Sequence, residues 1–503
     1  MGADGLTAFE RRRNELIARN LRRMEELQLP GLSSSLTALS GVQSKGRARP
    51  SGRDLSRAPK KPRDTPPPRQ SARVRGQAAD SVFAAGIAHE GAGGLVQLVD
   101  GTAMQQGPPE PKVRHPPGPL PFTSENATPV DDAAFLDSLR SIVASPGSSG
   151  RGPVRAKDVP RLRLAECDVV KLTREGTTAM AFHTSVAGGL LLAAADKQGN
   201  LALWRPEWGS THGDGGGGGG GGGAKGEDAF SGLVHFKVHD QFISALQWLG
   251  PAAPHCLVTA SYDGSCRMLD ASVGTFTLVG GLPEDVEISA MSATADGSIL
   301  YIGDNEGGLS RVDTREGAGP VAAAITAHDR KVNCVHVEPG AQTLIATAST
   351  DSAVKVWDAR TFGGASKSKP LHTFDQRKSC HAAYFAPDGS QRLLSTAFDD
   401  TIRVWDVSST SAPTSSHSVL IKHDNQTGRW VTPFRAVWGP GADWIGVGSM
   451  RRGVDVYAAD NGKQLATLQS EFMTAIPSRV CAHESLPVLA AATSSGRIHL
   501  YRC

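Results

Sequence analysis

Residues 328–360 constrain the fold more than any other stretch of the chain. A His-Asp pair precedes an alternating segment, VNCVHV, and a turn then leads to a second β-rich segment, TLIATAS. Asp351 opens the next turn, and the third segment ends in Trp357-Asp358. The alternation predicts strands, and a buried His, a Ser or Thr, the turn Asp and the Trp indole can satisfy one another's hydrogen bonds. The unit predicts a small antiparallel sheet that cannot bury both its faces alone, so it requires copies.

Related units recur at a spacing of roughly 40–50 residues, which is the period of WD repeats. Asp263, Asp351 and Asp399 each lie six residues before the position of the terminal Trp, so at least three units share one turn. The other units lack this Asp, and we expect packing to hold them. In chain order the seven units end at Trp204, Asp270, Arg315, Arg360, Asp406, Tyr457 and Tyr501. The predicted fold is all-β, a seven-bladed WD40 β-propeller.

The seventh unit has only three strands before the chain stops at Cys503. The segment DVVKL (168–172) lies before the first unit, is strand-like and has no other partner. We expect it to supply the missing strand, because a closed ring leaves no exposed sheet edge. The nine-glycine run at 215–223 becomes a flexible loop (213–226) inside the first blade. It matches G-x-G-x-x-G, but no capped amphipathic helix follows, so a dinucleotide site is rejected.

The N-terminal part of the chain is basic. Residues 1–80 carry 17 Lys or Arg and 8 Asp or Glu, a net of +9, which leaves −6 of the total of +3 for the remainder. We expect a basic amphipathic helix at 1–30, a disordered Pro/Gly/Ser-rich tail at 31–160 with a short helix at 131–141, and the propeller at 161–503. The first helix suits binding to a partner or to nucleic acid. The alternative is a solvated helix that packs loosely on its own protein. RAPKKPR (57–63) fits a nuclear-localisation segment, or serves only solubility.

Several classes of protein are disfavoured. The seven cysteines include no C-x-x-C pair, which indicates a reducing compartment and argues against a zinc site or a disulfide scaffold. No H-E-x-x-H, G-x-S-x-G or P-loop occurs in a usable context. No stretch approaches the roughly 18 apolar residues of a membrane span, and the N-terminus lacks the apolar core of a secretory signal. We expect a soluble intracellular protein that is not an enzyme and holds no cofactor or metal.

The predicted loops place mostly basic side chains on one face of the propeller. This face holds the loop before each first strand and the turn between the second and third strands, with Asp240 and Asp263 among its residues. A ring of cations, with an aromatic side chain to stack, suits a phosphate backbone. The alternative is that these loops are merely solvated. The candidate DNA-binding residues are Lys197, Arg330, Lys331, Arg377, Lys378, Lys422, His423, Arg429, Trp430, Arg451 and Arg452.

The segment IKHDNQTGRWVTPFRAVW (421–438) resembles the sixth-blade signature of the WD repeat-containing protein 76 family, relatives of the damage-specific DNA-binding subunit that recognises ultraviolet lesions. SYDGSCRMLD (261–270), HDRKVNCVHV (328–337) and FERRRNELIARN (9–20) resemble that family too. The resemblance implies nuclear binding of single- and double-stranded DNA, with some preference for damaged DNA. It also implies that Lys197 and Lys331 face DNA. The aromatic wedge hairpin of the lesion-binding relative is replaced here by NQTGRW.

A separate motif suggests a second function. Trp357-Asp358-Ala359-Arg360 fits the W-D-x-R ending of WD proteins that dock on the adaptor of cullin-4 ubiquitin ligases, and blade three has Asp313-Thr314-Arg315. The same Arg can instead cap its strand or pair with a neighbouring blade. The leading hypothesis is a nuclear, non-enzymatic DNA-binding propeller. The alternatives are a substrate receptor of a cullin-4 ligase, docking through Trp357, Asp358 and Arg360, and a scaffold that binds histones or peptides.

Overall fold

The computed structural model describes residues 97–99, 102–104, 118–144, 152–185, 189–208, 230–283, 286–316, 323–362, 369–408, 417–428 and 431–503. The helix predicted at 1–30, most of the tail, the glycine-rich loop, Arg429 and Trp430 lie outside these residues. Residues 1–108 form one compact unit, in which β1 (Gln97–Val99) pairs with β2 (Thr102–Met104). Residues 109–503 form the second.

The second unit contains seven sheets, which we call blades one to seven. The first three blades are β5–β8 (Thr177–Phe182, Leu192–Asp196, Asn200–Trp204, Leu233–Lys237), β9–β12 (Ile243–Trp248, Cys256–Ser261, Ser265–Asp270, Thr275–Gly281) and β13–β16 (Ile288–Ala293, Ile299–Asp304, Gly308–Asp313, Ala323–Thr326).

Blades four to six are β17–β20 (Val332–Val337, Leu344–Ser349, Ala353–Asp358, His372–Asp375), β21–β24 (Cys380–Phe385, Arg392–Ala397, Thr401–Asp406, Val419–Lys422) and β25–β28 (Val437–Trp438, Trp444–Ser449, Gly453–Ala458, Gln464–Gln469). Blade seven combines β29–β31 (Pro477–Ala482, Val488–Thr493, Arg497–Arg502) with β4 (Arg163–Lys171). Short 3-10 turns η2 (Val159–Arg161), η3 (Thr314–Glu316) and η4 (Ala359–Thr361) complete this part of the unit.

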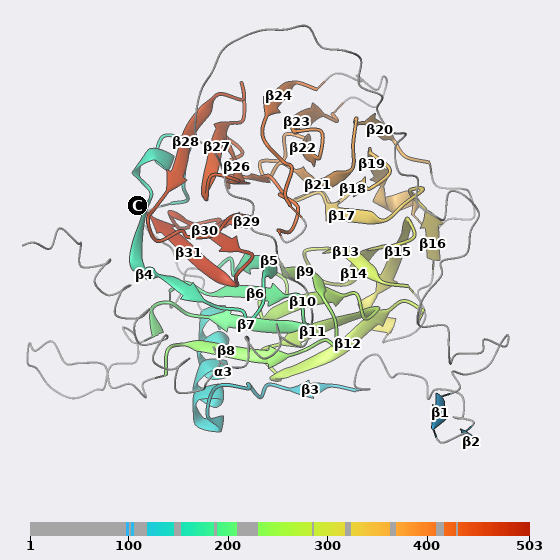
Figure 1. Cartoon of the computed structure of the whole chain (residues 1–503), viewed down its shortest axis with the longest axis vertical. Helices are drawn as coiled ribbons and strands as arrows, with labels where there is room; N and C mark the ends of the chain where they lie inside the picture. The colour runs from blue at the N-terminus through green and yellow to red at the C-terminus, as the bar shows by residue number, and fades with distance from the viewer. Residues whose placement is uncertain are drawn as a thin grey trace, which may run out of the picture. The chain divides into compact units, whose positions relative to one another are not determined.

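The seven sheets stand around a centre, with the first strand of each blade innermost (Figure 1). This confirms the predicted seven-bladed propeller. β4 pairs antiparallel with β31, with Val169 opposite His499, so the predicted ring closure is also confirmed, over a longer strand than 168–172. Strands within a blade are antiparallel. The loop before each first strand and the turn between the second and third strands therefore share one face, which we call the upper face. The remaining turns form the lower face.

A buried polar network holds blade four together. His328 lies 2.9 Å through Nδ1 from the Asp351 carboxylate and 2.7 Å through Nε2 from the Thr347 hydroxyl. The Trp357 indole N–H donates to the same hydroxyl at 2.9 Å. His328, Thr347 and Trp357 are buried, so each polar group is satisfied without water. The predicted His–Thr–Asp–Trp network is confirmed.

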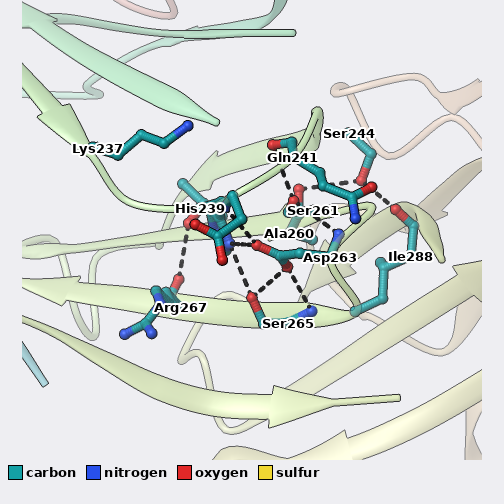
Figure 2. A network of polar contacts seen from close by, with 12 residues as sticks. Lys237, His239, Gln241, Ser244, Ala260, Ser261, Asp263, Ser265, Arg267 and Ile288 are labelled. Atoms are coloured by element: carbon teal, nitrogen blue, oxygen red, sulfur yellow. Dashed lines mark hydrogen bonds and ion pairs between the residues drawn. The ribbon is translucent and has the colours of Figure 1, made fainter. Parts of the chain in front are cut away.

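Blade two builds the same network without the indole (Figure 2). His239 contacts Asp263 at 3.2 Å, Ser265 at 3.0 Å and Thr259 at 2.8 Å. The Asp263 carboxylate also accepts from the backbone N–H and the hydroxyl of Ser265, at 2.9 and 2.6 Å. Leu269 occupies the Trp position and is buried. The network therefore survives the loss of its aromatic member.

Blade five replaces the histidine with an amide. Gln376 donates to the Ser395 hydroxyl at 2.9 Å and accepts from Arg403 at 2.5 Å. Arg403 pairs with Asp399 at 2.7 Å, and Trp405 donates to Ser395 at 2.8 Å. The turn Asp thus has an ionic partner here where blades two and four use an imidazole.

Ordered elements begin well before residue 161, which differs from the expectation of a disordered tail over 31–160. β3 (Leu120–Pro121) pairs with β12 and adds a fifth strand to blade two. It leads into α3 (Pro129–Ala144), which lies beside blades one and two (Figure 1). Phe135 of α3 is fully buried, 5.5 Å from the Trp208 ring. Among the described residues, no helix has the length and apolarity needed to cross a membrane.

The physical reason for this order is the packing of α3 and β3 against blades one and two. Phe122, Phe135 and Leu139 join a buried cluster with Phe236 and Phe276 of those blades. Burying such side chains contributes roughly 1.5–3 kcal/mol each. The short helix expected at 131–141 lies within α3, but the Pro- and Gly-rich composition of residues 31–160 gave no sign that it packs on the propeller.

The blade-two network makes a pH-dependent prediction. Burial alone would raise the pKa of Asp263, but hydrogen bonds from His239 and Ser265 lower it to about 2. The stability that this carboxylate contributes is fully present above its unfolded pKa of about 4 and is lost as the pH falls towards about 2. Asp263→Asn should therefore cost about 2 kcal/mol at neutral pH, and the difference from wild type should shrink below about pH 4.

Chemical denaturation of both proteins across this pH range measures the effect. Asp240→Asn is the matched control, because Asp240 directly follows His239 in the chain and its side chain is exposed. A loss for Asp263→Asn that equals that of Asp240→Asn, or that does not change with pH, would contradict the role given to the network.

Candidate nucleic-acid interface

The described basic candidates lie on the upper face, as the blade order requires. Lys197 and Lys331 are half-buried, whereas the other described Arg and Lys candidates are exposed. They are distributed over blades one, four, five and six. The exposed members are Arg330, Arg377, Lys378, Lys422, Arg451 and Arg452.

The geometry brings two of these candidates to a common cavity of about 300 Å³ at the upper end of the propeller centre, which we call the mouth pocket. Lys197 and Lys331 line it together with Arg435 and Arg479. No Asp or Glu is among its lining residues. The remaining lining residues are Phe242, Ser244, Tyr262, Ser289, Asn333, His381, Val431, Thr432 and Pro433. A cavity with four cationic side chains and no carboxylate favours an anionic ligand.

The turn between β6 and β7 positions Lys197. Asp196 accepts from the backbone N–H of Gln198 at 2.9 Å and of Asn200 at 3.0 Å. Gly199 adopts φ +85°, and a Cβ there would lie 2.0 Å from the His239 carbonyl oxygen, so the turn requires glycine. Blade one lacks the spacing of Asp263 but still fixes its turn with an aspartate.

Lys331, which precedes β17 of blade four, is positioned by Tyr262 in the turn between β10 and β11 of blade two. Its ammonium lies 4.5 Å from the centre of the Tyr262 ring and donates to the Tyr262 hydroxyl at 2.5 Å. Tyr262 in turn packs against Phe242, with ring centres 4.7 Å apart. The lysine is thus held at the pocket wall beside two aromatic rings, which can support a nucleobase by stacking.

Arg435 and Arg479 were not among the residues predicted from the sequence. Arg479 lies in β29, the innermost strand of blade seven, and Arg435 lies in the segment that leads into β25 of blade six. Arg479 is 9% exposed and donates Nε to the Thr178 carbonyl at 2.6 Å. Arg435 donates to the Asn333 carbonyl at 2.8 Å. A charged residue within the mostly apolar or small-residue segment that forms or enters the innermost strand was the signal that could have found them.

Other candidates do not reach the mouth pocket. Arg377 and Lys422 line a separate groove on blade five, which also contains Asp400 and Asp424. Arg451 and Arg452 line a depression on blade six with Glu471. These cations have carboxylate neighbours, so their local field is mixed. Arg330 and Lys378 line neither the mouth pocket nor these two depressions.

His423 differs from the expectation of a DNA-facing side chain. It is buried, with Nδ1 at 2.7 Å from the Asn425 amide oxygen and Nε2 at 3.4 Å from the Asp455 carboxylate. The imidazole therefore joins the polar core of blades five and six. In this repeat, the His that precedes a first strand points into the blade, as His328 does. His423 stands at the same point of its repeat and is therefore buried.

The W-D-x-R motif lies on the lower face. Arg360 forms a forked pair with its own Asp358, with Nε–Oδ1 at 3.0 Å and Nη2–Oδ2 at 2.7 Å. Arg315 and Asp313 repeat this arrangement on blade three, at 2.9 and 2.6 Å. Among the residues that the structure describes, neither arginine forms a hydrogen bond or ion pair with a neighbouring blade, and Trp357 is buried.

One side-chain cluster among the described residues has the donor types of a metal site. His255, Cys256 and Asp270 place their ligand atoms within 4.8 Å of one another. Asp270 already accepts from the Ser272 backbone at 2.8 Å, and burial together with Asp270 raises the pKa of the Cys256 thiol to about 12. We assign no metal to this cluster, because it offers only three donors and one of the Asp270 oxygens already accepts a hydrogen bond.

Comparison with known proteins agrees with the blade structure. The family described as WD domain, G-beta repeat matches residues 319–358 and 368–406, from the last strand of blade three to the third strand of blade five. WD repeat-containing protein 76 of Mus musculus is 30% identical over 403 residues, 77% of this chain. DNA damage-binding protein cmr1 of Aspergillus clavatus is 29% identical over 550 aligned positions that span 100% of both chains.

The chain is similar to the WD repeat-containing protein 76 family over most of its length. A further relative, DNA damage-binding protein CMR1 of Phaeosphaeria nodorum, is 30% identical over 67% of this chain and 66% of its own length. The match to the Mus musculus protein covers 60% of that protein's length. The family resemblance stated from the sequence is confirmed.

Proposed function

We propose that this relative of the WD repeat-containing protein 76 family is a non-enzymatic, nuclear DNA-binding protein that acts in the response to DNA damage. Duplex or single-stranded DNA crosses the upper face over the mouth pocket. The observation that carries the proposal is the pocket lining, which holds four cationic side chains and no carboxylate. Relatives named DNA damage-binding protein support it.

The chemistry of the upper face favours backbone contacts over base readout. Ammonium and guanidinium groups at Lys197, Lys331 and the exposed arginines can neutralise phosphates. Phe242 and Tyr262 offer ring faces at the same pocket. Such rings stack on any base, so we expect binding that tolerates sequence. Arg429 and Trp430 stay predictions, as does a preference for damaged DNA.

Salt dependence tests the backbone contacts. The logarithm of affinity for duplex DNA should fall linearly with the logarithm of salt concentration, by about 0.9 for each phosphate neutralised. Lys331→Glu should reduce the magnitude of this slope by about one and weaken duplexes of any sequence. Because charge reversal places an anion beside phosphates, its loss should exceed that of Lys331→Ala. Fluorescence anisotropy from about 50 to 200 mM salt measures both slopes.

Lys463→Glu is the matched control, because Lys463 is an exposed lysine on the lower face, in the turn between β27 and β28. It changes the net charge equally but should leave the slope unaltered. Melting temperatures of all variants separate binding from folding. Equal slopes for Lys331→Glu and Lys463→Glu, with both proteins folded, would show that the mouth pocket is not part of the DNA-binding site.

A second candidate function is docking on the adaptor of a cullin-4 ubiquitin ligase. One observation favours it: Arg315 and Arg360 present 72% and 73% exposed side chains in matching forks on adjacent blades. Each guanidinium keeps unused N–H donors beyond its own aspartate. The surface is on the face opposite the mouth pocket, so the two functions are compatible. Histone binding stays a prediction.

The double variant Arg315→Ala/Arg360→Ala should lower recovery of the ligase adaptor in co-purification by several-fold, because hydrogen bonds to charged groups contribute about 1.5–3 kcal/mol each. Arg497→Ala, which removes an exposed arginine from the upper face, is the control. Trp357 is unsuitable, since truncating a buried indole costs about 3–5 kcal/mol in packing alone. Undiminished recovery from the folded double variant would leave the Asp–Arg forks a purely structural feature.

A further inference from the structure

The inner end of the mouth pocket contains two guanidinium groups with no acidic partner. Arg479 donates to the carbonyl oxygens of Thr178, Pro433 and Ser478, at 2.6, 2.8 and 2.9 Å. Arg435 donates to the Asn333 carbonyl and lies beside the Tyr384 hydroxyl. Within the described part of the chain, neither arginine lies within 4.0 Å of a carboxylate as an ion pair.

Arg479 is buried and Arg435 is half-buried. Two positive charges close together in such surroundings are costly unless an anion compensates them. Burial, and then the charge of Arg435, lower the pKa of Arg479 to about 9. The carbonyl oxygens orient the guanidinium groups but supply no negative charge. The pair is therefore held in place by the fold without being neutralised by it.

A third side chain at this end of the pocket has an unused polar atom. His381 is 7% exposed, and its Nε2 has no hydrogen-bond partner among the described residues. The ring is fixed edge-on against Phe398, with ring centres 4.1 Å apart. Burial and the charges of Arg435, Arg479 and Lys331 lower its pKa to about 3, so it is neutral at physiological pH. A neutral imidazole can still donate one N–H to an anion.

We propose that Arg435, Arg479 and His381 form a binding site for a phosphomonoester dianion at the inner end of the mouth pocket. Such a group carries about −1.5 to −2 charge and three strong acceptor oxygens near neutral pH, which matches two guanidinium groups and an imidazole N–H. An internal phosphodiester carries a single charge and has a sugar on each side. A recessed site of this kind therefore suits a terminal phosphate better than a phosphate within a strand.

Two sources can supply this group. One is the phosphorylated end of a nucleic-acid strand that crosses the upper face, and this source rests on the proposed function. Phe242 and Tyr262 at the pocket wall are then placed to stack on the terminal nucleoside. The other source is a free phosphomonoester, whose binding does not depend on the DNA-binding proposal.

The test uses the full-length chain and one single-stranded oligonucleotide with a phosphate at its 5′ end, at its 3′ end, or at neither, labelled at an internal base. Fluorescence anisotropy should show that one phosphorylated form binds at least about tenfold more tightly than the unphosphorylated form. Arg435→Gln should bring this ratio close to one. Inorganic phosphate should also raise the melting temperature of the wild type more than that of Arg435→Gln.

Lys463→Gln is the matched control and should keep both the ratio and the shift. If Arg435→Gln melts well below the wild type without ligand, Arg435→Lys replaces it, since this variant keeps the charge but loses the planar fork. That variant should retain an intermediate preference for the terminal phosphate.

The outcomes separate this inference from the proposed function. Strand binding that is equal with and without terminal phosphate, together with no Arg435-dependent shift by phosphate, would overturn the inference while leaving DNA binding in place. An Arg435-dependent shift by phosphate without any strand binding would support the site, with a free phosphomonoester as its source, and would contradict the DNA-binding proposal.

Discussion

Pairing of β4 with β31 is the interaction on which the rest of the structure depends. It joins residues that are more than 300 positions apart and converts a row of seven sheets into a ring. Without it, blade seven would have three strands and an exposed edge. Arg502 reinforces the junction by bridging Asp168 of β4 at 3.0 Å and Glu207, which lies between β7 and β8 of blade one, at 2.9 Å. Closure therefore fixes blade seven against its first neighbour.

The closed ring accounts for the candidate site. Each blade directs its first strand to the centre, so side chains from all seven blades can converge there although they are far apart in sequence. The mouth pocket draws on blades one to seven in this way. At this centre Arg479 is buried and Arg435 is half-buried. A fold that is stabilised by apolar blade packing thus holds uncompensated positive charge at its centre.

Much of the fold could be predicted because the repeat has a strong local signal. Asp263, Asp351 and Asp399 recur at one spacing from the end of their strands, and each anchors a buried network in the structure. Gln376 was not recognisable as the partner in blade five, since an amide there resembles an ordinary loop residue. Ring closure was predictable from a count of strands and the edge that would otherwise remain.

The candidate site was harder to predict. Loop position correctly placed Lys197 and Lys331 on the upper face, but sequence alone could not tell which cations converge. Arg435 and Arg479 escaped notice because inner strands are expected to be apolar, and a single charge there has no periodicity. His423 was misjudged for the opposite reason. Its loop-like surroundings suggested exposure, whereas in this repeat the side chain at this position points into the blade.

The central claim is that DNA binds across the upper face at the mouth pocket. Hydrogen exchange of the full-length chain, measured with and without duplex DNA, tests it most directly. The account predicts slower exchange in the turn that carries Lys197, in the loop at 328–331 and in the segment before β25, with the turn at 358–362 on the lower face unchanged. Protection confined to residues 1–80, or to lower-face turns, would contradict it.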